Sequence, residues 1–277
     1  MEALEQAAGV LVTVSAAATQ GAGPTLLGAL RAGVGAVLAA ACDLADAAVA
    51  RQSGEGGGAD VQASMAPMAG RVGDRAEALA RGAFDNRAAC GRAVAKLGKS
   101  VKAAGEELAE MIREAEEKAG EEERNSALGD NDEDDDFALD TLSATELVVA
   151  RAAQPALAAA FDVLKAAVRA CARSPRDDSA TLEALLAKSR EASRLAEDAV
   201  AVLYAPHDDD EVRGAADELD ASAEPLCAAI EAAATSGDGD GDESGAADVV
   251  AAAGEAAAVM RGALEVVRTA CQRDEGA

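Results

Sequence analysis

The sequence predicts an all-α protein, a multi-helix bundle of about eight helices with one long central helix. Hydrophobic residues make up 50% of the 277 residues, yet the chain has no Trp, one Tyr and three Phe. Most of the apolar residues are Ala, Leu and Val, and Ala and Leu are strong helix formers. Apolar residues recur at helical spacing, and clusters of Gly, Pro and polar residues separate the segments.

Three helices are expected in the first part of the chain. The first covers about residues 2–19 and ends at a glycine-rich turn before Pro24. Pro24 suits the first turn of the second helix, which reaches about residue 51. A loop of glycines at 53–58 precedes the third helix, expected over about residues 60–81.

The fourth helix, over about residues 85–122, is the longest. One of its faces is apolar at helical spacing, with Cys90, Val94, Leu97, Val101, Leu108 and Ile112. The opposite face carries the basic stripe, which consists of Arg92, Lys96, Lys99 and Lys102.

An acidic linker follows, with six acids in the eight residues 129–136. The net charge is −5 over residues 1–124 and −21 over residues 125–277. We therefore expect an N-terminal helical segment at 1–124, a linker at 125–140 and an acidic helical segment at 141–277. The two segments form either separate bundles or one composite bundle.

Four helices are expected after the linker. Ser143 and Glu146 form a capping box that starts a helix ending near residue 173. Its apolar stripe is Leu157, Phe161, Leu164, Val168 and Cys171. Ser179 is expected to cap the sixth helix, which ends near Pro206. The apolar stripe of this helix consists of Leu182, Leu185, Leu186, Ser189, Ala196, Val200 and Leu203. The last two helices cover about residues 208–234 and 246–272.

The charge excludes two classes of partner. The formal net charge is −26 at pH 7, whereas direct nucleic-acid binding needs a cationic surface. An anionic membrane surface is disfavoured for the same reason. The most apolar stretch, residues 26–42, contains Arg31 and three glycines and is shorter than a membrane-spanning helix requires. We therefore expect a soluble protein that binds neither nucleic acid nor membrane.

Residues that usually carry out chemistry are scarce, so we expect no enzyme, no cofactor and no metal site. His207, the one histidine, is expected in a solvated turn without catalytic partners. The five cysteines lie far apart without a Cys-x-x-Cys pair, which favours reduced, buried thiols. The acidic loops at 130–141 and 238–249 lack the Gly and Glu that a calcium loop needs at its sixth and twelfth positions.

The basic stripe is the best candidate for a functional site. A local cationic face is unexpected on a chain this acidic, and two interpretations are open. Arg92, Lys96, Lys99 and Lys102 either pair with acids of this chain, including those of the linker, or bind an acidic surface on a protein partner.

Three stretches in order resemble one family. Residues 84–111 begin Phe-Asp-Asn-Arg and end Glu-Glu-Leu-Ala-Glu-Met, residues 134–146 contain Asp-Phe followed by Leu-Ser, and residues 195–206 end Val-Leu-Tyr-Ala-Pro. Together they resemble the cyclin-D-binding protein family, also called GCIP. The chain departs from that family at Ala205, where Pro is usual, and at His207, where Gln is usual. It also lacks the family's aromatic residues near the linker.

The resemblance implies an all-helical, non-enzymatic regulator of the cell cycle or of transcription. Its implied partner is a D-type cyclin or a helix-loop-helix protein, and its implied location is the cytoplasm and the nucleus. The alternative is a scaffold of the vinculin or α-catenin type, which also uses Ala-rich helical bundles.

Overall fold

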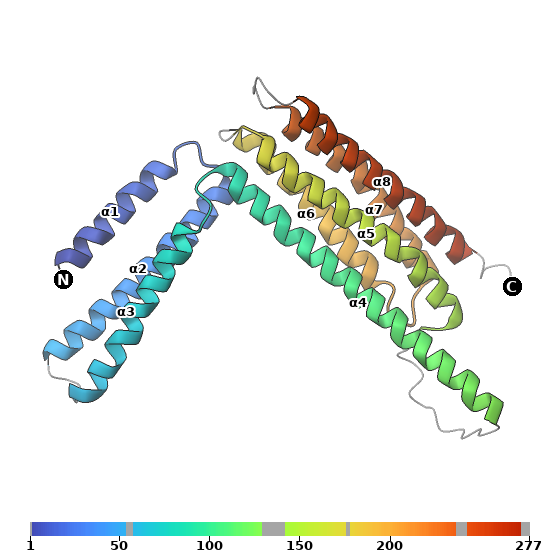
Figure 1. Ribbon diagram of the computed structural model, residues 1–277, viewed down its shortest axis with the longest axis horizontal. Helices are drawn as coiled ribbons and strands as arrows, with labels where there is room; N and C mark the ends of the chain where they lie inside the picture. The colour runs from blue at the N-terminus through green and yellow to red at the C-terminus, as the bar shows by residue number, and fades with distance from the viewer. Residues whose placement is uncertain (1, 54–57, 129–141, 176–177, 237–242, 273–277) are drawn as a thin grey trace. The chain divides into compact units, whose positions relative to one another are not determined.

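The computed structural model describes residues 2–53, 58–128, 142–175, 178–236 and 243–272. These residues form eight helices and no strand, which confirms the all-α prediction (Figure 1). In chain order the helices are α1 (Glu2–Ala18), α2 (Pro24–Ser53), α3 (Gly58–Ala80), α4 (Asn86–Leu128), α5 (Ala144–Arg173), α6 (Ser179–Ala201), α7 (Asp209–Thr235) and α8 (Glu243–Gln272).

The helix ends lie close to the predicted ones except at the ends of two helices. Helix α6 ends at Ala201 and not near Pro206 as expected. Helix α4 continues to Leu128 and has 43 residues, which gives a length of about 65 Å. The expected end near residue 122 is wrong because no Gly or Pro interrupts the chain before Gly129. The first four residues assigned to the acidic linker are therefore helical. Residues 129–140 lie outside the described residues, as do the loop residues 237–242.

The chain forms two compact units. The first comprises Met1–Cys90 with Arg176–Glu183, and the second comprises Gly91–Pro175 with Ala184–Ala277. The units thus divide inside α4 and inside α6. The segments at 1–124, 125–140 and 141–277 describe how charge is distributed along the chain, and they stay a prediction.

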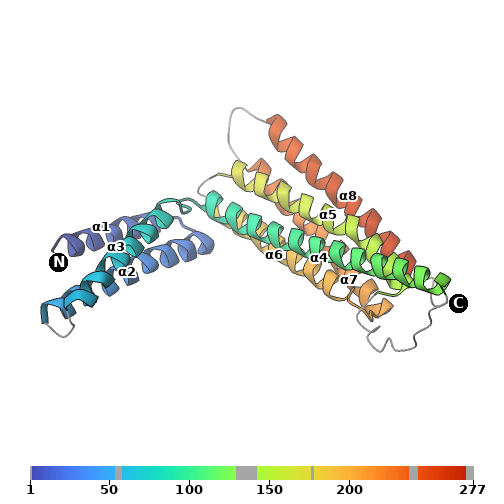
Figure 2. The same cartoon turned by 60° about the horizontal axis from the view of Figure 1, so that its bottom comes forward.

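In the first unit, α2 lies alongside α3 (Figure 2). A small buried cluster joins the start of α2 to the turn before α4, and it consists of Leu26, Leu30, Ala83 and Ala89. Gly33 marks the closest approach of α2 to α3, because a Cβ atom there would lie 2.7 Å from Cδ1 of Leu79.

Asn86 holds the turns of the first unit together. Its buried side chain accepts a hydrogen bond from the backbone N–H of Gly23 at 2.8 Å and donates one to the carbonyl of Gly21 at 3.0 Å. Glu183 caps the start of α2, because its carboxylate accepts hydrogen bonds from the backbone N–H and the hydroxyl of Thr25. These contacts satisfy backbone donors that the first turn of a helix leaves without an internal partner.

The second unit is a bundle built from α4 to α8, and α5 packs on both α7 and α8. Thirteen residues of α5 are buried, most of them Ala. Such small side chains let neighbouring helices approach closely. All seven residues of the predicted α6 stripe are buried, and Leu164 is 1% exposed. Phe161 is only half-buried, which corrects its placement in the core. Its ring lies against Gly98, with Nζ of Lys165 5.1 Å from the ring centroid.

The helix starts follow local side-chain chemistry. The predicted capping box is confirmed, since Ser143 N–H donates to Glu146 Oε2 at 2.6 Å and Glu146 N–H donates to Ser143 Oγ at 3.3 Å. The predicted cap at Ser179 is wrong. The cap is Asp178, whose Oδ1 accepts from the N–H of Thr181 at 3.1 Å.

Among the described residues, two helices are long and apolar enough to cross a bilayer by length and composition alone. One covers Pro24–Ala50 in α2, which is longer than the apolar stretch at 26–42, and 17% of its most apolar 18-residue window is buried. The other is α5, a core helix of the bundle, and 56% of its most apolar 18-residue window is buried.

Candidate functional site

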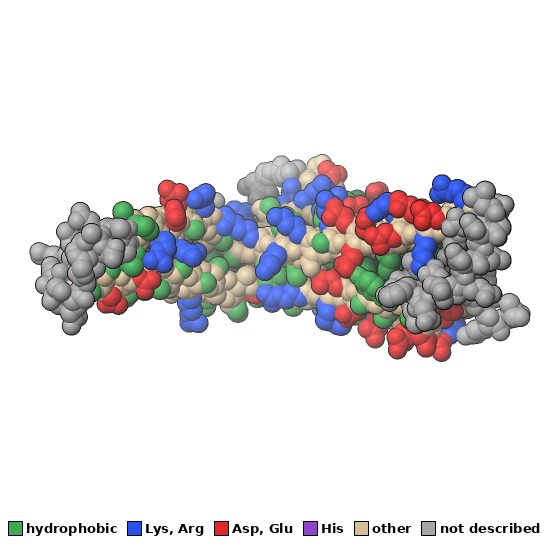
Figure 3. Space-filling model, turned by 90° about the horizontal axis from the view of Figure 1, so that it is seen from below, with side chains coloured by type: hydrophobic (Ala, Val, Ile, Leu, Met, Phe, Trp, Pro, Cys, Tyr) green, Lys and Arg blue, Asp and Glu red, His purple; other side chains and the backbone are tan. Residues whose placement is uncertain are grey.

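The basic stripe lies on the outer face of α4 in the second unit. Val94, Val101 and Leu108 are buried against the bundle, as the apolar period predicts. Arg92, Lys96, Lys99 and Lys102 are all exposed on the other side. Figure 3 shows blue side chains gathered over the first half of α4 and red side chains over its second half.

Most of the stripe forms no ion pair with the described residues of this chain. Lys102 pairs with Glu106 one turn further along α4, at 3.2 Å. Arg92, Lys96 and Lys99 have no ion-pair partner in the part of the chain that the structure describes. The described acids therefore pair with one of the four cations. The linker residues 129–140 lie outside the described part of the chain.

Neighbouring helices add cations beside the stripe. Gly98 faces Phe161 of α5, and the hydroxyl of Ser193 in α6 donates to the carbonyl of Leu97. Exposed cations on these two helices include Lys165 and Arg169 of α5 and Arg190 of α6. Sequence reasoning missed them because they are brought to α4 by helix packing and not by spacing along one helix. Lys165 is partly neutralised by Asp162, 2.6 Å away.

The second half of α4 has the opposite charge. Between residues 106 and 121 its exposed acids are Glu106, Glu107, Glu110, Glu114, Glu116, Glu117 and Glu121. Cations near the start of a helix and acids near its end gain nothing from the helix dipole, which favours the reverse order. Helix stability therefore does not explain this arrangement.

Several of these acids have partners within the bundle. Arg113 bridges Glu110 and Glu117, and its hydrogen bond and charge lower the pKa of Glu110 below its usual value. Arg151 of α5 donates to Glu116 at 2.9 Å. The hydroxyl of Tyr204 donates to Glu107, which raises the pKa of Tyr204.

His207 does not lie in a solvated turn. Its side chain is 2% exposed, and Nε2 lies 3.6 Å from Oδ1 of Asp209. Its buried Nδ1 has no hydrogen-bond partner among the described residues. Its backbone N–H donates to Oε1 of Glu146 at 3.0 Å. The expected solvent exposure of His207 is wrong because Glu146 accepts hydrogen bonds both within the α5 capping box and from the turn before α7. These bonds hold that turn against the bundle.

Glu146 is correspondingly perturbed. Burial alone would raise its pKa, but hydrogen bonds from Ser143 and from the His207 backbone, with the His207 charge, lower the pKa below its usual value. The described residues contain no group of three His, Cys, Asp or Glu side chains arranged to hold a metal ion.

The cysteines have different environments. Cys90, Cys171 and Cys271 are buried, Cys227 is half-buried, and Cys42 is exposed, contrary to the expectation of buried thiols. Burial raises the pKa of Cys271 to about 11, and Asp209 acts in the same direction. That thiol is therefore protonated and unreactive at neutral pH.

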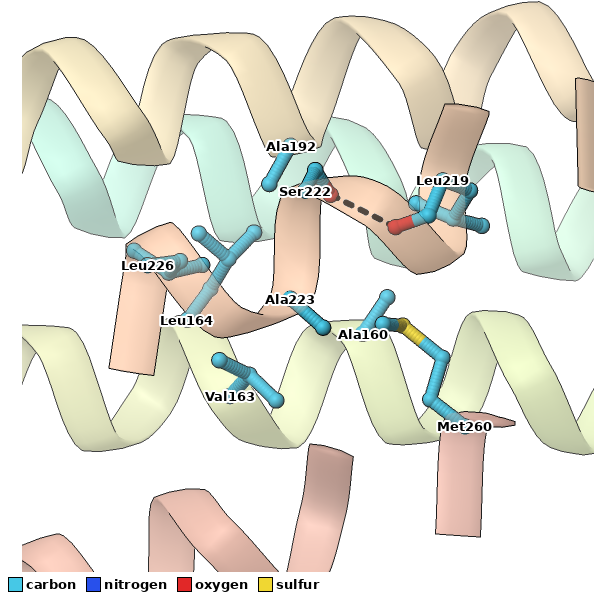
Figure 4. Close-up of a pocket in the computed structure, with 9 residues that line it drawn as sticks. All are labelled: Ala160, Val163, Leu164, Ala192, Leu219, Ser222, Ala223, Leu226 and Met260. Atoms are coloured by element: carbon cyan, nitrogen blue, oxygen red, sulfur yellow. Dashed lines mark hydrogen bonds between the residues drawn. The ribbon is translucent and has the colours of Figure 1, made fainter. Parts of the chain in front are cut away.

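The described part of the second unit contains hollows of different kinds. The gap in Figure 4, of about 10 Å³, lies among apolar side chains of α5 to α8, including Leu164, Leu219 and Met260. It has room for about one water molecule. A groove of about 300 Å³ between α6 and α7 is lined by Lys188, Glu191, Leu195, Glu218, Ala221, Ser222 and Pro225.

Comparison with known proteins gives one family. Residues 1–114 match the GCIP_N family model, described as Grap2 and cyclin-D-interacting, N-terminal. The GCIP-like resemblance predicted from the sequence is thus confirmed. The match includes the basic stripe and the first acids of α4, while the other two resembling stretches lie beyond it. No curated protein matches the chain.

Proposed function

We propose, from the match to the GCIP family, that this chain is a non-enzymatic adaptor that binds regulatory proteins in the cytoplasm and the nucleus. The family is described as cyclin-D-interacting, and the resemblance adds helix-loop-helix proteins, so the proposed partner is a D-type cyclin or a helix-loop-helix protein. Its role would then lie in control of the cell cycle or of transcription.

One observation supports the site most directly. Three cations of the basic stripe, Arg92, Lys96 and Lys99, are exposed and lack ion pairs with the described residues. They are held on a helix whose opposite face is buried in the bundle. A rigid, solvated cationic face steers an acidic partner towards it, and the gain appears mainly in the association rate.

The experiment measures the affinity of the full chain for a purified D-type cyclin and for a purified helix-loop-helix domain. Lys96→Glu with Lys99→Glu should weaken binding by at least tenfold and flatten its salt dependence, while the melting temperature stays unchanged because both side chains are exposed. Lys188→Glu with Arg261→Glu is the matched control, since it makes the same charge change on α6 and α8.

An unchanged affinity in the Lys96→Glu, Lys99→Glu variant would withdraw the stripe as the binding site. A drop in melting temperature with unchanged binding would show that the stripe pairs with this chain's own acids. A pull-down from native lysate, with the full chain as bait, tests the alternative function. Recovery of actin or junctional proteins in place of cyclins would favour the vinculin-like scaffold.

A further inference from the structure

The charges of α4 form an antisymmetric pattern about Ala103. Lys99, Lys96 and Arg92 precede Ala103 by four, seven and eleven residues. Carboxylates follow it at the same three intervals, at Glu107, Glu110 and Glu114. Each of these three cations therefore has an anion at the same distance on the other side of Ala103, whereas Lys102, one residue before it, has Ala104 at the matching position.

These six residues share one face of the helix. At about 100° of rotation per residue, each of them lies within about 40° of the direction of Ala103. All six are exposed, and so is Ala103 itself. The small side chain at the centre allows another helix to approach closely, while the buried Val94, Val101 and Leu108 occupy the opposite side.

We propose that a second copy of this chain docks on that face, with the two α4 helices antiparallel and a two-fold axis at Ala103. Arg92, Lys96 and Lys99 of one copy then lie opposite Glu114, Glu110 and Glu107 of the other, and each pair occurs twice. The hydroxyl of Tyr204 donates to Oε1 of Glu107 and leaves Oε2 for a second donor. Both oxygens of Glu110 accept from Arg113, but a carboxylate has about four lone-pair sites and can accept a further donor.

The association is weak and reversible, since exposed ion pairs individually contribute little. The copies also repel each other through a net charge of −26 each. Moderate salt screens this long-range repulsion, because the Debye length is about 8 Å at physiological ionic strength. The dimer uses the same cations as the acidic partner in the proposed function, so self-association and partner binding compete.

Analytical ultracentrifugation of the full chain at physiological ionic strength tests the proposal. The wild type should pass from monomer to dimer as its concentration rises. Variant A, Arg92→Glu with Lys96→Glu, and variant B, Glu110→Lys with Glu114→Lys, should each dimerise at least tenfold more weakly. An equimolar mixture of A and B should regain the dimer, because every reversed residue then faces a reversed partner.

Two controls change the same amount of charge away from α4. Lys188→Glu with Arg261→Glu matches variant A, and Glu224→Lys with Glu255→Lys matches variant B. Both should dimerise as the wild type does, and melting temperatures should confirm that all variants are folded. If variant A or variant B is destabilised, a single chain that carries all four substitutions is used in place of the mixture. This fourfold variant should self-associate, because each reversed residue of one copy then faces a reversed residue of the other.

A wild type that stays monomeric up to its solubility limit overturns the proposal, as does an A and B mixture without a dimer. Variant B also separates this proposal from the proposed function. It keeps the basic stripe, so it should lose self-association but still bind an acidic partner, whereas variant A should lose both.

Discussion

Helices α2 and α5 are matched in length and apolar character but differ in burial. Each has 30 residues, and their most apolar windows have mean hydropathies of 1.7 and 1.5. Only 17% of the α2 window is buried, against 56% for α5. Helix α5 contacts α4, α7 and α8, whereas α2 contacts α1 and α3. Apolar content therefore sets how much surface a helix can bury, and the number of neighbouring helices decides how much it does bury.

The same contrast extends to the two units. In the first, valines of α1 and α2 remain exposed, among them Val10, Val14 and Val49. In the second, Leu185 and Leu186 of α6, Ile230 of α7 and Val267 of α8 are buried. Because stability comes mainly from buried apolar surface, the first unit should open at a lower free energy than the second.

The largest expected effect is in the second unit. Leu164→Ala should lower the free energy of unfolding by about 2–5 kcal/mol, because Leu164 is buried and its small neighbours cannot fill the space. Phe161→Ala should cost less, since the ring is half-buried beside Gly98. Urea unfolding followed by circular dichroism measures both, and equal losses would contradict the burial difference.

A smaller loss is expected in the first unit. Asn86→Ala removes the side chain that bridges Gly21 and Gly23, and an unsatisfied buried polar group costs about 1–3 kcal/mol. Asn86→Asp is the matched variant, because it retains the acceptor for Gly23 and removes the donor to Gly21. Proteolysis rates near residues 21–25 measure the opening. If both variants are cut at the wild-type rate, the bridge does not stabilise the unit.

The third prediction concerns Glu146. Its pKa is lowered in the folded state, so its ionised form stabilises the fold above the unfolded-state pKa. That contribution is lost as the pH falls through the folded-state pKa. Glu146→Gln should cost about 1 kcal/mol at neutral pH, as the loss of a cap does, and the difference from wild type should shrink in acid. A difference that is constant from neutral pH to acid would contradict this account.

The smallest effects separate two glycines of α2. Gly35→Ala should stabilise the chain by about 0.5–1 kcal/mol, because a Cβ atom there meets nothing within 4 Å and Gly weakens a helix interior. Gly33→Ala should gain less, because its Cβ would displace the end of the Leu79 side chain. Melting temperatures of the two variants should therefore differ, and equal gains would place α3 further from α2.

Patterns within one helix were predicted well from the sequence. Helical period gave the buried faces of α4 and α6, and cap chemistry gave the start of α5 at Ser143 and Glu146. The exposure of Arg92, Lys96, Lys99 and Lys102 followed from the same period. These features depend on residues that are close in sequence.

Features that depend on distant residues were not predicted. The burial of His207 requires Glu146, which lies 61 residues away in the chain. Likewise, the cap of α2 comes from Glu183 of α6, and no local signal near Thr25 indicates it.

Hydrogen–deuterium exchange of the full chain, followed by mass spectrometry, tests the difference between the units most directly. Amides of α2 and α3 should exchange through frequent opening, while those of α5 and of α6 beyond residue 184 should exchange far more slowly. The two sets should become distinguishable well below the denaturant concentration that unfolds the bundle. Equal protection of α2 and α5 would contradict the account, because it would mean that burial by neighbouring helices does not govern their stability.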